Sequence, residues 1–314
     1  MNLLRAEWSR LFHRRLTLIL AAAMLAVLAL LVVGFGATSR QPTPLELTTA
    51  QGRAAESRQV WTEQRADCLE RQRTRGRSFE GECEFGPQPQ VDDYLPYRFS
   101  FARQIESLLY FSALVLSLVG FILGASFIGA EWTSGGMTNL LLWRPRREAV
   151  LGAKLAVVVA GVAAISVAYL ALWVGAFWLL GAAIGSVGAT SAGAAASIAL
   201  FGLRILGLTL FLAVAGAALA TLGRRTAAAL GIAMAYFVVF ELGTLIVSSL
   251  LRTGSSGQMR LSTYIAALLT KQLRQVGQFQ NYVVTWPEAI VVLAVLAAAL
   301  TGAAFAVVRT RDVT

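Results

Sequence analysis

The sequence predicts an all-α, polytopic membrane protein. Of its 314 residues, 57% are hydrophobic and only 14% are charged, whereas a soluble domain carries about 25% charged residues. The mean hydropathy is +0.65. Several apolar runs reach ~20 residues or more, which is long enough to cross a hydrocarbon core about 30 Å thick. Because these runs are continuously apolar, they are typical of helices and not of alternating barrel strands.

The first sixteen residues (1–16) are predicted to form an amphipathic helix that lies in the membrane interface, with Trp8 at the level of the headgroups. Its apolar side chains recur at helical spacing: Leu3, Leu4, Trp8, Leu11 and Phe12. Its polar side chains are expected on the other side: Arg5, Glu7, Arg10 and Arg14. The alternative is that this segment serves only as a basic orientation signal.

Six spans are expected from the apolar runs. They cover residues 17–36, 108–130, 151–183, 192–222, 227–250 and 288–308. The first run is too long for a cleaved leader, and no small-residue cleavage site follows it. The third and fourth exceed the minimum length, so tilting or a break in the glycine-rich stretch 181–193 is expected. Small residues at four-residue spacing predict close helix contacts at Gly120 and Gly124, and at Gly216 and Ala220.

Basic residues in the short loops predict that both chain ends are cytoplasmic. The membrane is expected to be the plasma membrane. With that orientation, twelve basic residues lie inside: Arg5, Arg10, Arg14, Arg15, Arg144, Arg146, Arg147, Lys154, Arg224, Arg225, Arg309 and Arg311. Four lie in the short outside loops: Arg252, Arg260, Lys271 and Arg274. The last residues, 309–314, form the cytoplasmic tail.

A long polar loop, residues 37–107, is expected outside the membrane. Its stretch 45–75 is rich in good helix formers, so one or two helices are predicted there. Cys68 and Cys83, the only two cysteines, both fall in this loop, where an oxidising compartment favours a disulfide. The alternative is two free thiols. A metal site is not expected, because the lone histidine, His13, lies across the membrane.

A second outside segment, residues 251–287, is predicted to hold an interfacial or re-entrant helix before the last span. Its apolar face comprises Leu261, Tyr264, Ile265, Leu268 and Leu269.

Several kinds of chemistry are excluded by the residues present. No phosphate-binding Gly-x-x-x-x-Gly-Lys-[Ser/Thr] occurs, and one histidine excludes a histidine-based metalloprotease or a Ser-His-Asp triad on one face. The chain is therefore not expected to be an enzyme or to hold a cofactor of its own. The net charge of +10 is spread over two membrane faces, which indicates lipid headgroups as partners and not nucleic acid.

Two charged residues fall inside predicted spans, Arg204 in the fourth and Glu241 in the fifth. Counted from the turn at Arg224-Arg225 at ~1.5 Å per residue, they lie at comparable depths. An unpaired charge in lipid costs at least ~2.5 kcal/mol, so a mutual ion pair is expected. The functional alternative is a substrate or proton site in a central cavity.

The link 131–150 has more detail than a simple connection requires. Glu131, Thr133 and Ser134 can cap a short helix, and Gly135-Gly136 permits a sharp bend. An apolar lip at 140–143 and a basic run at 144–147 follow. We interpret the link as a surface for a partner protein beneath the membrane.

With these features the chain resembles the permease subunits of type-2 ABC exporters. The most specific match is Gly129-Ala-Glu-Trp-Thr-Ser-Gly-Gly-Met137, followed by Leu140-Leu-Leu-Trp-Arg-Pro-Arg-Arg147 and Lys154. In that family this stretch is the coupling helix, which docks into the ATPase subunit. The resemblance implies that six residues contact or position the ATPase: Glu131, Thr133, Gly135, Met137, Arg144 and Arg147. The long outside loop with its two cysteines departs from many bacterial members and leaves the substrate class open.

The resemblance further implies a dimer of two permease chains, identical or different, each carrying an ATPase that holds ATP and Mg²⁺. The cargo would be a lipophilic or amphipathic drug, antibiotic, peptide or lipid, exported by alternating access. Two other classes stay open at this point. One is an ion-coupled secondary carrier that uses Arg204 and Glu241. The other is a sensor subunit whose outside loop binds a ligand such as an antimicrobial peptide.

Overall fold

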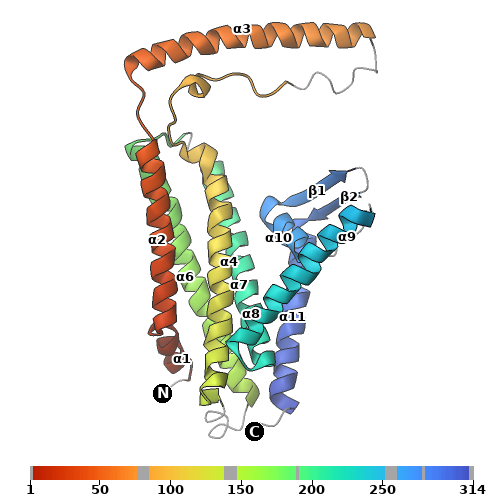
Figure 1. The fold of residues 1–314 in the computed structure, drawn as a ribbon. Helices are drawn as coiled ribbons and strands as arrows, with labels where there is room; N and C mark the ends of the chain where they lie inside the picture. Colours follow the sequence, from red (N-terminus) through yellow and green to blue (C-terminus); the bar gives the residue numbers. More distant parts are fainter. Residues whose placement is uncertain are drawn as a thin grey trace. The chain divides into compact units, whose positions relative to one another are not determined.

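The structure is a computed structural model that describes residues 3–75, 85–137, 147–188, 191–251, 260–277 and 280–310. The chain divides into two compact units, which are described separately. The larger unit comprises residues 1–29, 105–175 and 190–314, and the smaller comprises 30–104 and 176–189. Helices make up most of the described residues (Figure 1), so the chain is mostly helical as predicted, with one hairpin in addition.

Five helices are long and apolar enough to cross a membrane in the part of the chain that the structure describes. They are α2 (Arg15–Thr38), α4 (Phe101–Thr133), α6 (Arg147–Ala183), α7 (Ala192–Gly223) and α11 (Trp286–Thr310). The expected break after the third span is present, since α6 ends at Ala183 and the Ser191 side chain caps α7 by accepting from the Ala194 N–H.

The predicted span 227–250 is built differently from the other five. It consists of α8 (Thr226–Ala235), a π-helical segment η3 (Tyr236–Leu242) and α9 (Gly243–Leu251). The backbone stays in right-handed helical conformation across both junctions, at Ala235 and at Gly243. A sixth span therefore stays a prediction, because neither α8 nor α9 alone reaches membrane-spanning length.

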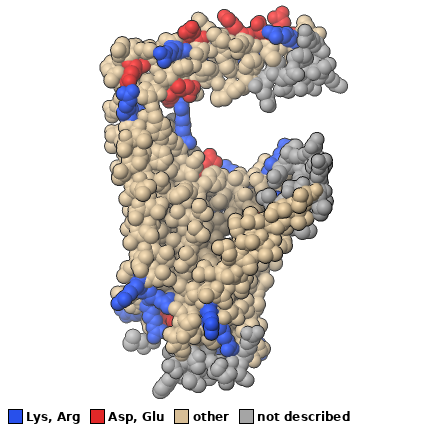
Figure 2. All heavy atoms as spheres, viewed as in Figure 1, with Lys and Arg blue, Asp and Glu red and all other residues tan. Residues whose placement is uncertain are grey.

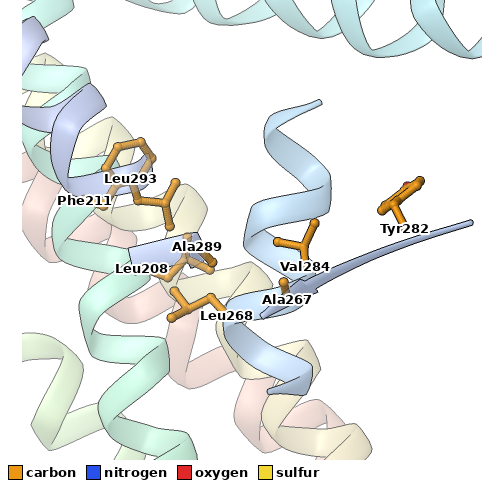
Figure 3. Close-up of a cluster of buried hydrophobic side chains, with 8 residues drawn as sticks. All are labelled: Leu208, Phe211, Ala267, Leu268, Tyr282, Val284, Ala289 and Leu293. Atoms are coloured by element: carbon orange, nitrogen blue, oxygen red, sulfur yellow. The ribbon is translucent and has the colours of Figure 1, made fainter. Parts of the chain in front are cut away.

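In the larger unit, α7 packs along α11, and α10 (Leu261–Thr270) packs against both. The structure confirms a helix within the segment 251–287 as α10. The apolar core that joins these helices is drawn in Figure 3. It comprises Leu208, Phe211, Ala267, Leu268, Tyr282, Val284, Ala289 and Leu293.

An antiparallel hairpin follows α10 and was not predicted from the sequence. Strand β1 (Gln272–Gly277) pairs with β2 (Gln280–Thr285), in a register that runs from Gln272 opposite Thr285 to Gly277 opposite Gln280. In β2 the side chains alternate as a half-buried strand requires: Tyr282 and Val284 are buried, whereas Val283 is exposed. The segment 251–287 therefore holds the predicted helix and, in addition, a hairpin that the all-α prediction did not include.

Small residues let the backbones of α4 and α7 come into direct contact. A Cβ atom added at Gly124 would overlap the carbonyl oxygen of Ala213, and one added at Gly216 would lie 2.5 Å from the carbonyl oxygen of Phe121. The small-residue face predicted on α4 therefore contacts α7, and the one predicted on α7 contacts α4.

The smaller unit contains α3 (Pro44–Arg75), one helix over the stretch predicted to hold one or two. A capping box begins it: the Thr43 N–H donates to Glu46 Oε2 (2.9 Å), and the Glu46 N–H donates to Thr43 Oγ1 (3.3 Å). The returning chain, with the short 3₁₀ helix η2 (Val91–Tyr94), bonds to α3 through Arg58 Nε and the Pro89 carbonyl (2.8 Å). The predicted Cys68–Cys83 disulfide stays a prediction, because Cys83 lies outside the described residues.

The capping box gives a pH-dependent prediction. Hydrogen bonds from the Thr43 N–H and hydroxyl hold the pKa of Glu46 below its ordinary value. Because the pKa of Glu46 is lowered, its ionised carboxylate stabilises the first turn of α3 at pH values above the ordinary carboxyl pKa. This contribution is lost as the pH falls through the lowered pKa of Glu46. We expect amide exchange in that turn, corrected for intrinsic rates, to accelerate over this acidic range. Glu46→Gln should remove the pH dependence, and an unchanged pH profile in that variant would contradict the assignment.

Candidate functional site

Three charged side chains from three helices meet at the end of the larger unit where α4 ends and α6 begins. Helix α1 (Leu3–Phe12) supplies Glu7, α4 supplies Glu131 and α6 supplies Lys154. Lys154 Nζ lies 3.0 Å from Glu7 Oε2 and 2.5 Å from Glu131 Oε2. The Glu7 and Lys154 side chains are each 1% exposed, and Glu131 is 15% exposed. We call these three residues the buried charge cluster.

Helical spacing explains how α1 reaches this position. Glu7 and Leu11 lie one turn apart on α1, and Lys154 and Gly161 lie two turns apart on α6. The Leu11 side chain occupies the space where a Cβ at Gly161 would lie, so a glycine is needed there for Leu11 to pack against α6. Lys154, two turns away, forms the second contact with α1 through Glu7. The two contacts fix α1 along α6.

The face of α1 that the protein buries differs from the predicted one. Glu7 was expected on the polar side and Leu11 on the apolar side, but the protein buries these two residues together, while Leu4 and Trp8 are exposed. The correction has a physical reason: an ion pair with Lys154 compensates the burial of the Glu7 carboxylate. The exposed apolar side chains leave the predicted interfacial location of α1 open.

Arginines border the cluster. Arg10 Nη1 lies 3.1 Å from Glu7 Oε1, and Arg14 Nη1 donates to the Ser126 carbonyl at 3.1 Å. Burial lowers the pKa of Arg14, while the carboxylates of Glu131 and Glu7 act in the opposite direction. Since an arginine stays charged in proteins, two carboxylates face one lysine and two bordering guanidinium groups. Figure 2 shows Lys and Arg side chains gathered at this end of the larger unit.

The turn after α4 starts beside the cluster. Helix α4 ends at Thr133, whose hydroxyl donates back to the Ala130 carbonyl (3.0 Å), and Gly135 adopts a positive φ of 71°. That conformation costs a glycine little and turns the chain sharply. Met137 is fully buried and packs with Val150 and Trp132.

The predicted docking residues divide by exposure. Thr133 is exposed, Glu131 and Gly135 are half-buried, and Met137 is buried. Arg147 is the first residue of α6, while Arg144 lies outside the described residues. The neighbouring Ser134 is also exposed. The structure thus brings Glu131, Thr133, Gly135 and Met137 together at one turn, whose exposed residues are Thr133, Ser134 and Gly136.

The turn between α7 and α8 contacts the same region. The Arg224 guanidinium carbon lies 5.2 Å from the centre of the Trp132 ring. A Cβ at Gly129 would lie 2.5 Å from the Thr226 nitrogen, so α4 and the start of α8 touch at the backbone. Displacement of the end of α4 would therefore act on α1, α6 and α8 together.

The structure does not bring Arg204 and Glu241 together, which corrects the expected ion pair. Glu241 accepts hydrogen bonds from the Ser262 N–H (2.9 Å), the Ser262 hydroxyl (2.6 Å) and the Tyr236 hydroxyl (3.3 Å). The Arg204 guanidinium carbon instead lies 5.9 Å from the centre of the Trp286 ring. The two charged side chains therefore contact different neighbours and do not form an ion pair with each other.

The importance of Glu7 and Lys154 was not recognised from the sequence. One signal was present, since Lys154 falls inside the predicted span 151–183 and a charge there requires a partner. Among the residues that the structure describes, no group of three or more His, Cys, Asp or Glu side chains could hold a metal ion.

Comparison with known proteins identifies one family. The family model described as "ABC-2 family transporter protein" matches residues 1–312. No curated protein and no solved structure matches the chain.

Proposed function

Because this chain belongs to the ABC-2 family of transporter permeases, we propose that it is the membrane-spanning part of an ATP-driven exporter. Family membership makes it a multi-pass transport component that pairs with an ABC ATPase subunit. The proposal adds that the ATPase hydrolyses ATP with Mg²⁺ while this chain moves a lipophilic or amphipathic compound outward. The observation that carries it is the buried charge cluster, which joins the docking turn to α1 and α6.

The cluster supports a mechanical role for the turn. ATP-driven closure of the ATPases would displace the end of α4, and Glu131 is bound to Lys154 at 2.5 Å. Since Lys154 also binds Glu7, the displacement would move α6 and α1 as one body. Packed, buried interfaces transmit displacement because they deform little.

The six coupling residues have two roles in this proposal. Thr133, and beside it Ser134, would contact the ATPase because both side chains are exposed. Glu131 and Met137 would position the turn from within, and Gly135 would supply its bend. Arg147 would orient the start of α6, and Arg144 would contact the ATPase or the lipid headgroups.

The remaining assignments belong to the same proposal. A second permease copy, identical or different, would complete the transport path in a dimer. Both chain ends would be cytoplasmic in the plasma membrane, and the start of α1 and the end of α11 lie at the same end of the larger unit (Figure 1). The basic side chains there would bind anionic lipid headgroups.

A bulky side chain on the exposed part of the turn should prevent ATPase docking. We expect Ser134→Trp to lower the amount of ATPase that copurifies with the tagged permease by about tenfold or more, since loss of one well-packed contact of 1.4 kcal/mol is tenfold in affinity. Ser197→Trp is the matched control. Both serines are exposed and donate to a nearby backbone carbonyl, Ser134 to that of Glu131 and Ser197 to that of Gly193. Ser197, however, lies near the start of α7, far along that helix from the Arg224 turn. Equal ATPase recovery in the two variants would contradict docking at this turn.

A further inference from the structure

A large apolar cavity lies in the larger unit, away from the buried charge cluster. Its volume is about 1090 Å³, at the upper end of the range of small-molecule sites. Side chains of α4, α7, α8, η3, α10 and α11 line it, and most of them are Leu, Val, Ile, Ala and Phe. The cavity can therefore hold an apolar body of considerable size.

One carboxylate, that of Glu241, is part of this lining. The residue is 9% exposed and lies on the π-helical segment η3, a type of helix that is frequent at functional sites. Its two oxygens accept three hydrogen bonds from Ser262 and Tyr236, all from uncharged donors. A carboxylate offers about four acceptor positions, so acceptor capacity remains toward the cavity.

No cation in the described structure neutralises this carboxylate. Among described residues, no Lys or Arg nitrogen lies within 4 Å of Glu241, and Arg204, the charge expected to pair with it, lies over Trp286 and does not line the cavity. A buried charge without a counter-ion is costly, and a bound cation removes that cost.

A second polar atom in the wall points to the same conclusion. Ser117 of α4 lines the cavity and is 8% exposed, yet its hydroxyl has no hydrogen-bond partner among the described residues. The cavity thus presents a carboxylate, an unused hydroxyl and several tyrosines in an otherwise apolar wall. Tyrosine rings attract cations through their faces.

We propose that this cavity binds a lipophilic monocation, with the positive group at Glu241 and the apolar body against α4, α8 and α11. Binding of such a cation does not depend on the proposed function. Only the identification of this ligand class with the exported cargo rests on it. A purely structural role for Glu241 is the competing explanation, because its carboxylate receives the Ser262 N–H in the first turn of α10 and so caps that helix.

Binding of tetraphenylphosphonium to the purified full chain in lipid nanodiscs, without ATPase, tests the proposal. Tetraphenylborate has the same shape and the opposite charge. Ala299→Trp fills the cavity from α11 and so serves as the blank for partition of the ions into lipid. Binding to the cavity is the binding to the unchanged chain minus the binding to this variant. The affinity of the cavity for the phosphonium should exceed its affinity for the borate by about tenfold or more.

Three variants separate charge from capping. Glu241→Gln keeps an acceptor for Ser262 and removes the charge, so phosphonium affinity should fall by about tenfold or more. Ser262→Ala removes a hydroxyl but keeps the charge, and affinity should stay within about threefold. Glu288→Gln is the control outside the cavity, since Glu288 caps the Thr285 N–H (3.0 Å), and binding should not change.

Equal affinity for the two ions would overturn the proposal and indicate a site for neutral lipid chains. Unchanged phosphonium binding in a folded Glu241→Gln protein would also overturn it, and would leave Glu241 as a cap of α10. Because no ATPase is present, either result leaves the permease assignment intact. Failure of ATP-driven transport would in turn leave the binding result intact.

Discussion

Lys154→Met is expected to cause the largest loss of folded protein among single substitutions in the described structure. The change leaves two carboxylates, Glu7 and Glu131, facing each other without the ammonium that lies 3.0 and 2.5 Å from them. Removal of one partner from a buried ion pair costs about 3–5 kcal/mol. We therefore expect a much lower yield of monodisperse protein, a lower apparent Tm and loss of ATP-driven transport.

A matched control for that experiment breaks an exposed ion pair at the same end of the larger unit. Arg309 Nε lies 3.9 Å from Glu148 Oε1, and both side chains are largely exposed, so Arg309→Gln should change the free energy of unfolding by less than about 1 kcal/mol. The triple variant Glu7→Gln, Glu131→Gln, Lys154→Met should recover most of the stability, because it removes both carboxylates of the buried charge cluster together with the ammonium that compensates them. Normal stability of Lys154→Met alone would contradict the buried cluster.

Gly124→Leu is expected to have the second largest effect. A Cβ at this position overlaps the Ala213 carbonyl oxygen, which is backbone and cannot rotate away as a side chain could. Helices α4 and α7 would have to separate, and overpacking of this kind costs about 3 kcal/mol or more. Apparent Tm and detergent resistance of the purified chain should both fall.

Gly207→Leu provides the control for this substitution. Gly207 also lies on α7 and is exposed, but nothing lies within 4 Å of a Cβ built there. The same exchange of side chains should therefore leave the apparent Tm nearly unchanged. Equal destabilisation by Gly124→Leu and Gly207→Leu would mean that the close approach of α4 and α7 does not exist.

The apolar runs predicted the long helices well, because the requirement for internal hydrogen bonding in lipid leaves few other structures for ~20 apolar residues. The same pattern could not reveal that the run 226–251 contains a π-helical segment, since composition does not distinguish hydrogen-bond spacing within a helix. The hairpin at 272–285 was missed for another reason. Its strands are only six residues long and directly follow an apolar helix. Their alternation of buried and exposed side chains is therefore a weaker pattern than the helical periodicity of the segment before them.

The candidate site was predicted in position but not in pairing. The turn at residues 131–137 was recognised, whereas the burial of Glu7 was not, because the sequence of a single amphipathic helix gives no information on a buried counter-ion. The expected pair of Arg204 and Glu241 failed for a related reason. A count of residues from a shared turn estimates depth along the helix axis, but contact also depends on which way each side chain points around that axis.

The central claim is that this chain moves its cargo only when a separate ATPase drives it. Vesicles reconstituted with the purified chain alone, and with the chain plus its copurified ATPase, should be compared for uphill movement of the copurified cargo. The account predicts accumulation against a gradient only with both the ATPase and ATP, and none with a proton or sodium gradient across vesicles that hold the chain alone. Uphill transport by the chain alone would contradict it.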